Sequence, residues 1–311
     1  MDNPSKMVNL LICTNAAYLQ HAAVCLRSLL ENNRDFFFNV VVVGRVGETL
    51  DEEKLRRSLE PTPWHAISFR EFLPPMGQVL PLNPNAKYTL DIWSRIWVSD
   101  FFDDDVERVL YLDADIVVVG GVTPLWQMDL EGALFGAVDI PGSMRGVENL
   151  EMAEEDGYFN SGVLLFDLKQ WRQSNALETL LDYVSRQYQR LKDPDQDALN
   201  ACFASRRKKM DYKWNAIGPF FREPNPLPLK REIIEKVRED AVIIHYNGAT
   251  KPWDFVSNHP RRKEYWKYLE MTEWRGYVPA DKTLHNMLRE FGSAILPKPL
   301  KAFVKKVWSP S

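Results

Sequence analysis

Residues 109–119 constrain the fold of this chain more than any other stretch. They read Val-Leu-Tyr-Leu-Asp-Ala-Asp-Ile-Val-Val-Val, so an apolar run ends on two carboxylates one residue apart and then resumes as a β-branched run. This pattern predicts a buried strand that ends at a site, followed by a second short strand. Asp is depleted in strands, and two carboxylates at the end of a buried strand repel each other unless a cation lies between them.

Asp113 and Asp115 are therefore candidate metal ligands. Carboxylate oxygens suit Mn²⁺ or Mg²⁺, particularly when the ion also holds the phosphates of a substrate. The alternative is that the two residues only cap a turn, which is the commoner case for a bare Asp-x-Asp pattern. The apolar residues before the pair and the motifs described below favour the metal.

The composition is that of a globular protein. The chain has 311 residues, of which 45% are hydrophobic, and this is enough for a large core. Its net charge of −4 gives no overall electrostatic reason to expect nucleic acid as a partner. No signal peptide and no apolar run of membrane-spanning length is visible, so we expect a cytoplasmic location.

The first part of the chain alternates strands and helices. Strands are predicted at 7–13, 38–43 and 66–69, with helices at 17–30 and 52–59. This alternation predicts an α/β fold with a mostly parallel sheet. Thr14 and Asn15 follow the first strand, in a turn where the N–H groups of a helix N-terminus face any bound anion or base. The chain has neither the glycine motif of dinucleotide-binding proteins nor a P-loop.

Arg95 lies on a predicted helix over 89–102, one helix before the paired carboxylates. Its guanidinium is expected to pair with Asp113 or with a substrate phosphate. A solvated arginine on the polar face of an amphipathic helix is the alternative.

The segment after the carboxylates adds further candidates. A predicted strand over 132–139 ends on Asp139, and the acidic segment 141–157 has weak periodicity. We expect that segment to be a flexible loop beside the site rather than a packed element, able to act as a lid. Asn160-Ser161-Gly162 then opens a core strand, where the glycine either allows a close approach to the backbone or marks a bulge.

Two motifs complete the set. Residues 193–200 open a helix with Pro and acidic residues in its first turn, and capping explains Asp195 more easily than Gln196. In 240–253, an apolar strand ends on His245, and a turn that contains Gly248 leads to Lys251. Such an arrangement can supply an imidazole to a metal and an ammonium to a phosphate, although a lone His after a strand is more often structural.

Four blocks of this sequence resemble glycosyltransferase family eight, which includes the bacterial lipopolysaccharide galactosyl- and glucosyltransferases and, more distantly, glycogenin. They are Tyr-Leu-Asp-Ala-Asp at 111–115, Phe-Asn-Ser-Gly-Val-Leu-Leu at 159–165, Asp-Gln-Asp-Ala-Leu-Asn at 195–200, and His-Tyr-Asn-Gly-Ala-Thr-Lys-Pro-Trp at 245–253. Each block is modest, but their joint order and spacing are specific. The resemblance covers roughly residues 7–270.

The resemblance implies a GT-A-like, nucleotide-sugar-binding domain over 7–270 with a mostly parallel central sheet, plus a small helical extension over 271–311. It also implies a Mn²⁺-dependent enzyme, with Mg²⁺ as the alternative ion. Such an enzyme transfers a hexose from UDP-galactose or UDP-glucose to a hydroxyl of a cell-envelope glycan or glycolipid, such as lipopolysaccharide, with retention of configuration. The alternatives are a self-glycosylating primer of the glycogenin kind and a nucleotide-sugar-binding module without turnover.

The resemblance further implies roles for single residues. The metal ligands look like Asp113, Asp115 and His245, the diphosphate contacts like Gly248 and Lys251, and the donor-sugar contacts like Arg95, Asn160, Ser161 and Asp195, with Ala114 beside the ribose. Gln196 falls near the reacting face of the sugar. We expect same-face attack by the acceptor hydroxyl, with a double displacement through Asp195 or Asp139 as the lesser option.

The turn at Thr14 and Asn15 departs from the family pattern. Bacterial relatives have an acidic turn there that helps hold the uracil, whereas this turn is shorter and neutral. Both side chains are still able to hydrogen-bond the edge of a base.

The end of the chain predicts a short basic amphipathic helix. Five apolar residues between Leu300 and Trp308 have helical spacing, and Lys298, Lys301, Lys305 and Lys306 supply the polar side. We expect residues 298–308 to dock on an anionic membrane surface at the inner face of the cell membrane, where a lipid-linked acceptor would lie. The alternative is that this helix packs on the domain or on a partner.

Overall fold

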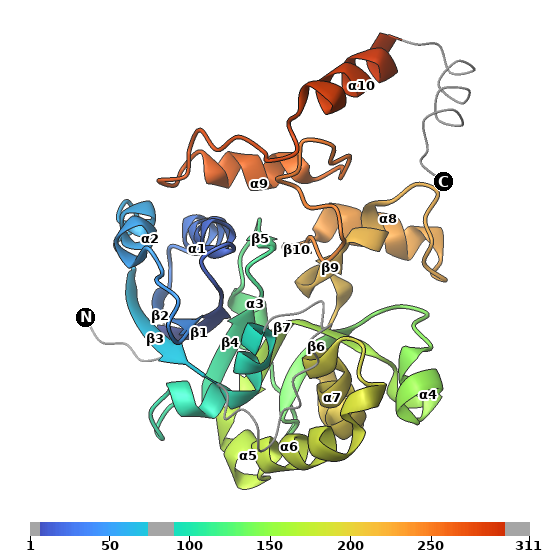
Figure 1. Cartoon of the computed structure of the whole chain (residues 1–311). Helices are drawn as coiled ribbons and strands as arrows, with labels where there is room; N and C mark the ends of the chain where they lie inside the picture. Colours follow the sequence, from blue (N-terminus) through green and yellow to red (C-terminus); the bar gives the residue numbers. More distant parts are fainter. Residues whose placement is uncertain (1–6, 74–89, 296–311) are drawn as a thin grey trace.

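The computed structural model describes residues 7–73 and 90–295 (Figure 1). Its main sheet contains β1 (Met7–Cys13), β2 (Phe37–Arg45), β3 (His65–Phe72), β4 (Arg108–Leu112), β6 (Phe135–Asp139), β7 (Phe159–Asp167) and β8 (Arg207–Lys209). The strand order is β3-β2-β1-β4-β7-β6-β8. A second sheet has the order β5-β10-β9 and contains β5 (Ile116–Val118), β9 (Ala216–Ile217) and β10 (Ile243–His245).

The main sheet is mostly parallel, as the sequence predicts. β1 pairs in parallel with both β2 and β4, β2 with β3, and β6 with β8. β7 is the exception, since it runs antiparallel to both of its neighbours, β4 and β6. This reversal brings the start of β7 beside the end of β4.

Both faces of the main sheet are buried, which explains why its central strands are apolar at nearly every position. Along β2, Val40 and Val42 pack with α1 (Leu19–Asn32) and α2 (Glu52–Leu59), whereas Val41 and Val43 pack on the opposite face. That opposite face is covered by the 3₁₀ helix η2 (Leu90–Phe101), α5 (Leu168–Gln173), α6 (Ala176–Gln187) and α7 (Pro194–Phe203). The remaining α-helices are α3 (Thr123–Trp126), α4 (Arg145–Leu150), α8 (Arg231–Asp240), α9 (Arg262–Leu269) and α10 (Leu284–Ile295).

Two elements differ from the predicted ones. α1 begins at Leu19 rather than at 17, because the Asn15 side chain accepts the amide N–H of Tyr18 and holds a turn ahead of the helix. Within the predicted helix 89–102, the structure has a run of 3₁₀ turns over Leu90–Phe101 with a non-helical Trp97.

The prediction that 141–157 lacks packed elements is wrong. This segment contains α4 and the short 3₁₀ helix η3 (Glu154–Asp156). Arg145 on α4 forms ion pairs with Asp193 and Asp197. Because ion pairs rather than an apolar stripe hold the helix, the hydrophobic pattern gives no signal for it.

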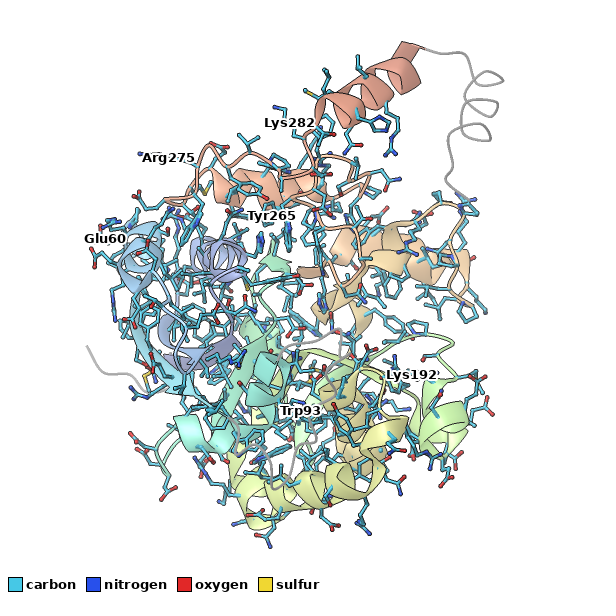
Figure 2. All side chains as sticks on the ribbon, viewed as in Figure 1. Glu60, Trp93, Lys192, Tyr265, Arg275 and Lys282 are labelled. Atoms are coloured by element: carbon cyan, nitrogen blue, oxygen red, sulfur yellow. The ribbon has the colours of Figure 1, made fainter. Side chains whose placement is uncertain are left out.

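The C-terminal part begins against the body and then leaves it. The Glu273 amide N–H donates to Ser58 Oγ at 3.0 Å, and Lys54 Nζ lies 4.5 Å from the centre of the Trp274 ring. Tyr265 on α9 faces α1, where its hydroxyl lies 2.7 Å from His21 Nδ1 (Figure 2). Figure 1 shows α10 extending away from the sheets. The domain boundary at 270 stays a prediction, and the basic segment 298–308 lies outside the described residues.

In the part of the chain that the structure describes, no helix has both the length and the apolar character needed to cross a bilayer.

Candidate active site

The three predicted metal ligands lie at the ends of three strands, two of which pair with each other. Asp113 directly follows β4, Asp115 directly precedes β5, and His245 is the last residue of β10. β10 pairs antiparallel with β5, with His245 opposite Ile116. The amide N–H of Tyr246 also donates to the main-chain oxygen of Asp115 at 3.0 Å. This register places the imidazole beside the two carboxylates.

The structure brings these three side chains together. His245 Nε2 lies 3.1 Å from Asp115 Oδ1 and 3.7 Å from Asp113 Oδ2. One ligand atom from each residue lies within 4.8 Å of the others. Two carboxylate oxygens and one imidazole nitrogen form a donor set suited to Mn²⁺ or Mg²⁺, so these residues fit a divalent ion.

Lys251 adds a cation on the other side of Asp115. Its Nζ lies 2.6 Å from Asp115 Oδ2 and donates to the main-chain oxygen of Tyr246 at 2.8 Å. Burial acts to raise the pKa of Asp115, but His245 and Lys251 outweigh burial and lower this pKa well below its usual range. Burial acts to lower the pKa of Lys251, and Asp115 raises it overall. Both groups are therefore charged at neutral pH.

Arg95 holds two carboxylates at once. Its Nη1 lies 3.0 Å from Asp113 Oδ1, and its Nε lies 3.0 Å from Asp195 Oδ2. Nη1 also donates to the main-chain oxygen and to the hydroxyl of Ser161, and the guanidinium lies over the Tyr111 ring. Arg95 is only 8% exposed. The predicted pairing with Asp113 is confirmed, and the alternative of a solvated arginine is wrong.

Arg95 contributes to folding as well as to the site. Removing one partner of a buried ion pair costs about 3–5 kcal/mol, a large part of the roughly 5–15 kcal/mol by which a typical domain is stable. Burial raises the pKa of Asp195 to about 6, even though Arg95 lowers it, and Asp113 adds to the rise. Substitution of Arg95 would therefore lower stability and raise the pKa of Asp195 further.

Gly162 makes room for the ligand cluster. Its main-chain oxygen accepts the amide N–H of Asp113 at 2.8 Å. A Cβ at this position would lie 2.3 Å from His245 Cε1 and 2.8 Å from Asp113 Oδ2, so any side chain here must displace a ligand. Against β6 the register shifts between Gly136, opposite Leu165, and Val138, opposite Asn160, so the extra residues of β7 lie in the stretch that contains Gly162. Both interpretations of Gly162 therefore hold, because this glycine allows a close approach and lies within the irregular part of the strand.

Gln196 is held inside the protein by its amide group. Its Oε1 accepts from Asn160 Nδ2 at 2.9 Å and from the Ser161 amide N–H at 3.0 Å, and its Nε2 donates to the Tyr158 hydroxyl at 2.9 Å. Both lone pairs of the carbonyl oxygen are thus engaged by protein donors.

Asp139 has different partners. It forms an ion pair with Arg207, and Lys209 Nζ lies 3.7 Å from its Oδ2. Among the described residues, neither Arg207 nor Lys209 forms an ion pair with any of the three candidate ligands. The structure therefore links Asp139 to the β6–β8 edge of the sheet rather than to the ligand cluster.

The turn after β1 is stabilised by local bonds. The Thr14 hydroxyl donates to the main-chain oxygen of Asn15 at 3.3 Å, and Asn15 Oδ1 accepts from the Tyr18 amide N–H at 3.0 Å. Glu48, from the loop after β2, accepts the Ala16 amide N–H at 2.8 Å and brings a carboxylate to this turn. No sequence pattern singles out Glu48, because the two loops are adjacent only in the folded sheet.

Two predicted contacts are small residues. Ala114 is buried between the two carboxylates and joins the apolar cluster beneath α1. Gly248 lies in the turn between His245 and Lys251, where an added Cβ would be 3.8 Å from Arg222 Nη2.

Asn215 belongs to the site, although no sequence pattern indicated it. Its Oδ1 lies 3.0 Å from His245 Nδ1. Asn215 directly precedes β9, which pairs in parallel with β10. The only signal in the sequence was a polar residue at the start of a short apolar strand. This signal becomes informative only when β9 is known to pair with β10, the strand that ends at His245.

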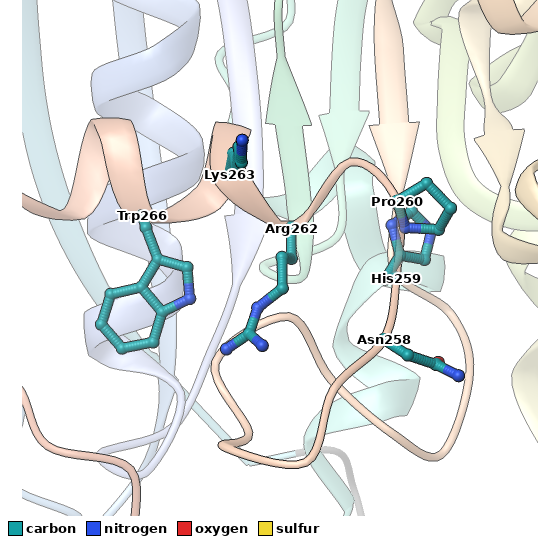
Figure 3. Close-up of a pocket in the computed structure, with 6 residues that line it drawn as sticks. All are labelled: Asn258, His259, Pro260, Arg262, Lys263 and Trp266. Carbon is teal, nitrogen blue, oxygen red and sulfur yellow. The ribbon is translucent and has the colours of Figure 1, made fainter. Parts of the chain in front are cut away.

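A surface pocket of about 590 Å³ is lined by Asn258, His259, Pro260, Arg262, Lys263 and Trp266 (Figure 3). None of these is a predicted site residue. Arg262 Nη1 donates to the main-chain oxygen of Ser257 at 2.7 Å, and Trp266 Nε1 donates to that of Pro252 at 3.0 Å. Two of the pocket residues thus hold the loop that follows Lys251.

Gly162→Ala tests the ligand cluster, and its effects on metal binding and on stability can be measured separately. We expect Mn²⁺ affinity, measured by calorimetry, to fall about tenfold or more, because the new methyl group displaces His245 or Asp113. The free energy of unfolding should fall by about 1–3 kcal/mol from overpacking. Gly121→Ala is the matched control, because its nearest neighbour would be 4.0 Å away. Wild-type Mn²⁺ affinity in Gly162→Ala would contradict the steric argument.

Known proteins resemble this chain in sequence. General stress protein A of Bacillus subtilis (strain 168) is 31% identical over 186 residues, covering 58% of this chain and 65% of that protein. This chain thus spans slightly less than two thirds of the Bacillus protein. Lipopolysaccharide 1,2-glucosyltransferase of Escherichia coli is 29% identical over 276 residues, covering 86% of this chain and 79% of that enzyme.

The fold is also shared with a solved structure. Galactosyltransferase LgtC, in complex with donor and acceptor sugar analogs, superposes with a TM-score of 0.71 at 20% identity, covering 88% of this chain and 98% of LgtC. The expected GT-A-like fold is therefore confirmed. The model of the family described as glycosyl transferase family 8 matches residues 9–257. Together with the shared fold, this match shows that the chain belongs to glycosyltransferase family 8.

Proposed function

We propose that this glycosyltransferase is a retaining, metal-dependent hexosyltransferase that uses UDP-galactose or UDP-glucose. The observation that carries the proposal is the convergence of Asp113, Asp115 and His245, with Lys251 bound to the same carboxylate. A hydroxyl of a cell-envelope glycan or glycolipid is the proposed acceptor, and the similarity to a lipopolysaccharide 1,2-glucosyltransferase over most of the chain supports this class.

Asp113, Asp115 and His245 would hold the divalent ion, with Mn²⁺ as the proposed ion and Mg²⁺ as the alternative. When bound, such an ion stabilises negative charge on the leaving diphosphate. Lys251 carries a positive charge on a side chain anchored by the Tyr246 main-chain oxygen, so it can neutralise the same group. Gly248 would let the diphosphate approach the backbone of the same turn.

The donor would lie across the ends of β1 and β4 and the start of β7. Thr14 and Asn15 would contact the base and Ala114 the ribose. Asn160, Ser161, Arg95 and Asp195 would contact the sugar. Arg95 also fixes the Asp195 carboxylate from one side, which supports a positioning role for this pair.

Same-face attack is the proposed mechanism. The bond from the anomeric carbon to the phosphate oxygen breaks, the acceptor oxygen forms the new bond on the same face, and the acceptor proton passes to the leaving phosphate. Gln196 is a poor nucleophile, because both lone pairs of its carbonyl oxygen accept N–H groups. A double displacement through Asp195 is the lesser option, and one through Asp139 is weakened by its ion pair with Arg207.

A peripheral location at the inner face of the cell membrane is also proposed. Residues 298–308 carry Lys298, Lys301, Lys305 and Lys306 beside apolar residues at helical spacing. The helix that precedes this segment exposes Leu284 and Leu288 by 69% and 62%. Apolar side chains next to a cluster of lysines are typical of segments that bind anionic lipid surfaces.

A panel of nucleotide sugars tests the donor and the metal together. With Mn²⁺ we expect slow hydrolysis of UDP-galactose or UDP-glucose without any acceptor, and a chelator should abolish it. Intact mass after incubation separates the alternatives: added hexoses would indicate a self-glycosylating primer. Tight donor binding without turnover of any sugar would indicate a binding module and overturn the proposal.

Substitution of the ligands tests the site. Asp113→Asn and His245→Ala should each remove metal-dependent hydrolysis while the protein stays folded by circular dichroism, because each deletes one donor atom. Asp129→Asn and His65→Ala, outside the cluster, are the controls and should keep full activity. Full activity in either ligand variant would contradict the assignment.

Truncation tests the membrane proposal. Deletion of residues 297–311 should abolish co-sedimentation with vesicles that contain anionic lipid and leave donor hydrolysis intact, because only the basic segment is lost. Vesicles of phosphatidylcholine alone should bind neither form. Unchanged binding to anionic vesicles after truncation would overturn the docking proposal.

A further inference from the structure

Which nitrogen of His245 can bind a metal depends on which one carries a proton. A neutral imidazole has one N–H donor and one lone pair, and the bond made by one nitrogen fixes the role of the other. His245 Nδ1 faces Asn215 Oδ1 at 3.0 Å, while Nε2 faces the carboxylates of Asp113 and Asp115. His245 and Asn215 are only 2% and 1% exposed, so solvent does not replace this bond.

The orientation of the Asn215 amide is determined by its next neighbour. Asn215 Nδ2 donates to Asn160 Oδ1 at 2.8 Å. The Gly162 amide N–H also donates to Asn160 Oδ1, at 3.0 Å. A main-chain N–H can only donate, so the oxygen of Asn160 must face it. Asn215 must then present its nitrogen to Asn160 and its oxygen to His245.

The next amide is fixed in the same way. Asn160 Nδ2 donates to Gln196 Oε1, and the Ser161 amide N–H donates to this same oxygen. Gln196 Nε2 therefore points away, and it donates to the Tyr158 hydroxyl. Tyr158 in turn donates to Asp197 Oδ1 at 2.5 Å.

Asp197 ends the chain of hydrogen bonds. Its other oxygen receives Arg145 Nη2 at 2.8 Å and the Lys192 amide N–H at 2.6 Å. All five bonds from His245 to Asp197 therefore run in one direction, and each donor meets an acceptor. A buried polar network in which every member is satisfied holds its side chains rigidly.

We infer that Asn215 is a positioning residue that keeps the proton of His245 on Nδ1. Nδ1 is then always a donor, so His245 can bind the ion only through Nε2, which carries a lone pair when the imidazole is neutral. The buried amides of Asn160 and Gln196 hold Asn215 in the required orientation. The inference deepens the proposed function, since the metal is the partner of Nε2. It also ties the ligand cluster to the Gln196 amide through Asn160.

A direct measurement needs no variant of Asn215. Protein labelled with ¹⁵N-histidine, observed by NMR with Mg²⁺ as a diamagnetic ion, reports which ring nitrogen carries a proton. The His245 signals are identified by their loss in His245→Ala. We expect a protonated Nδ1 throughout. A bare Nδ1 with the proton on Nε2 would overturn the inference.

Two variants of Asn215 separate positioning from packing. Asn215→Leu removes the acceptor at similar volume, and we expect its Mn²⁺ affinity, measured by calorimetry without donor, to fall about 10–100-fold. Asn215→Asp keeps an oxygen toward Nδ1, and its affinity should stay at or above the wild-type value. The control is Asn9→Leu, at a buried Asn in β1 that bonds to the main-chain oxygen of Arg108, and it should leave Mn²⁺ affinity unchanged.

Wild-type affinity in Asn215→Leu would overturn the inference, and so would an equal loss in Asn215→Leu and Asn215→Asp. The conservative variant and the NMR measurement decide the matter even when Asn215→Leu fails to fold. If the wild-type protein binds no Mn²⁺ at all, the proposed function fails, whereas the protonation of Nδ1 still decides this inference.

Discussion

Mutual repulsion between the carboxylates of Asp113 and Asp115 is the constraint on which this structure depends. Two like charges 4 Å apart near a protein surface repel by about 4 kcal/mol, a large part of the stability of a typical domain. Arg95 meets one carboxylate, Lys251 meets the other, and the imidazole of His245 lies beside both. The helix, strand and loop that carry these groups must therefore converge for the end of β4 to stay folded.

The direction of one strand makes this convergence possible. In a fully parallel sheet, ligand sites form where strands end. Here β7 runs against its neighbours, so it contributes its first residues, with Gly162 beside the end of β4. The second sheet then places His245, which is distant in the sequence, beside the two carboxylates. Both the antiparallel direction of β7 and the small residue at 162 are needed. A side chain at Gly162 would occupy the space of the His245 imidazole.

Much of this was predictable from the sequence, because the decisive residues lie next to strands that are apolar without interruption. Asp113, Asp115 and His245 each adjoin such a run, and the mostly parallel sheet follows from the alternation of strands and helices. Asn215 was not predictable, because its role depends on the pairing of β9 with β10. α4 was missed because Arg145 is held by ion pairs, which leave no hydrophobic period. For Gln196, the sequence motif indicated a position near the site, but it could not indicate the two hydrogen bonds that the carbonyl oxygen of this residue accepts.

The connection between β6 and β7 has a further consequence. It leaves the sheet at Asp139 and returns at Phe159, two residues that are paired across the strands. A hairpin closed at its base in this way can gain or lose residues without changing the register of the strand after it, so Asn160, Ser161 and Gly162 keep their places. Most of the connecting segment can therefore change in length or sequence without moving this strand, whereas Arg145 and Tyr158 must stay, because both hydrogen-bond Asp197.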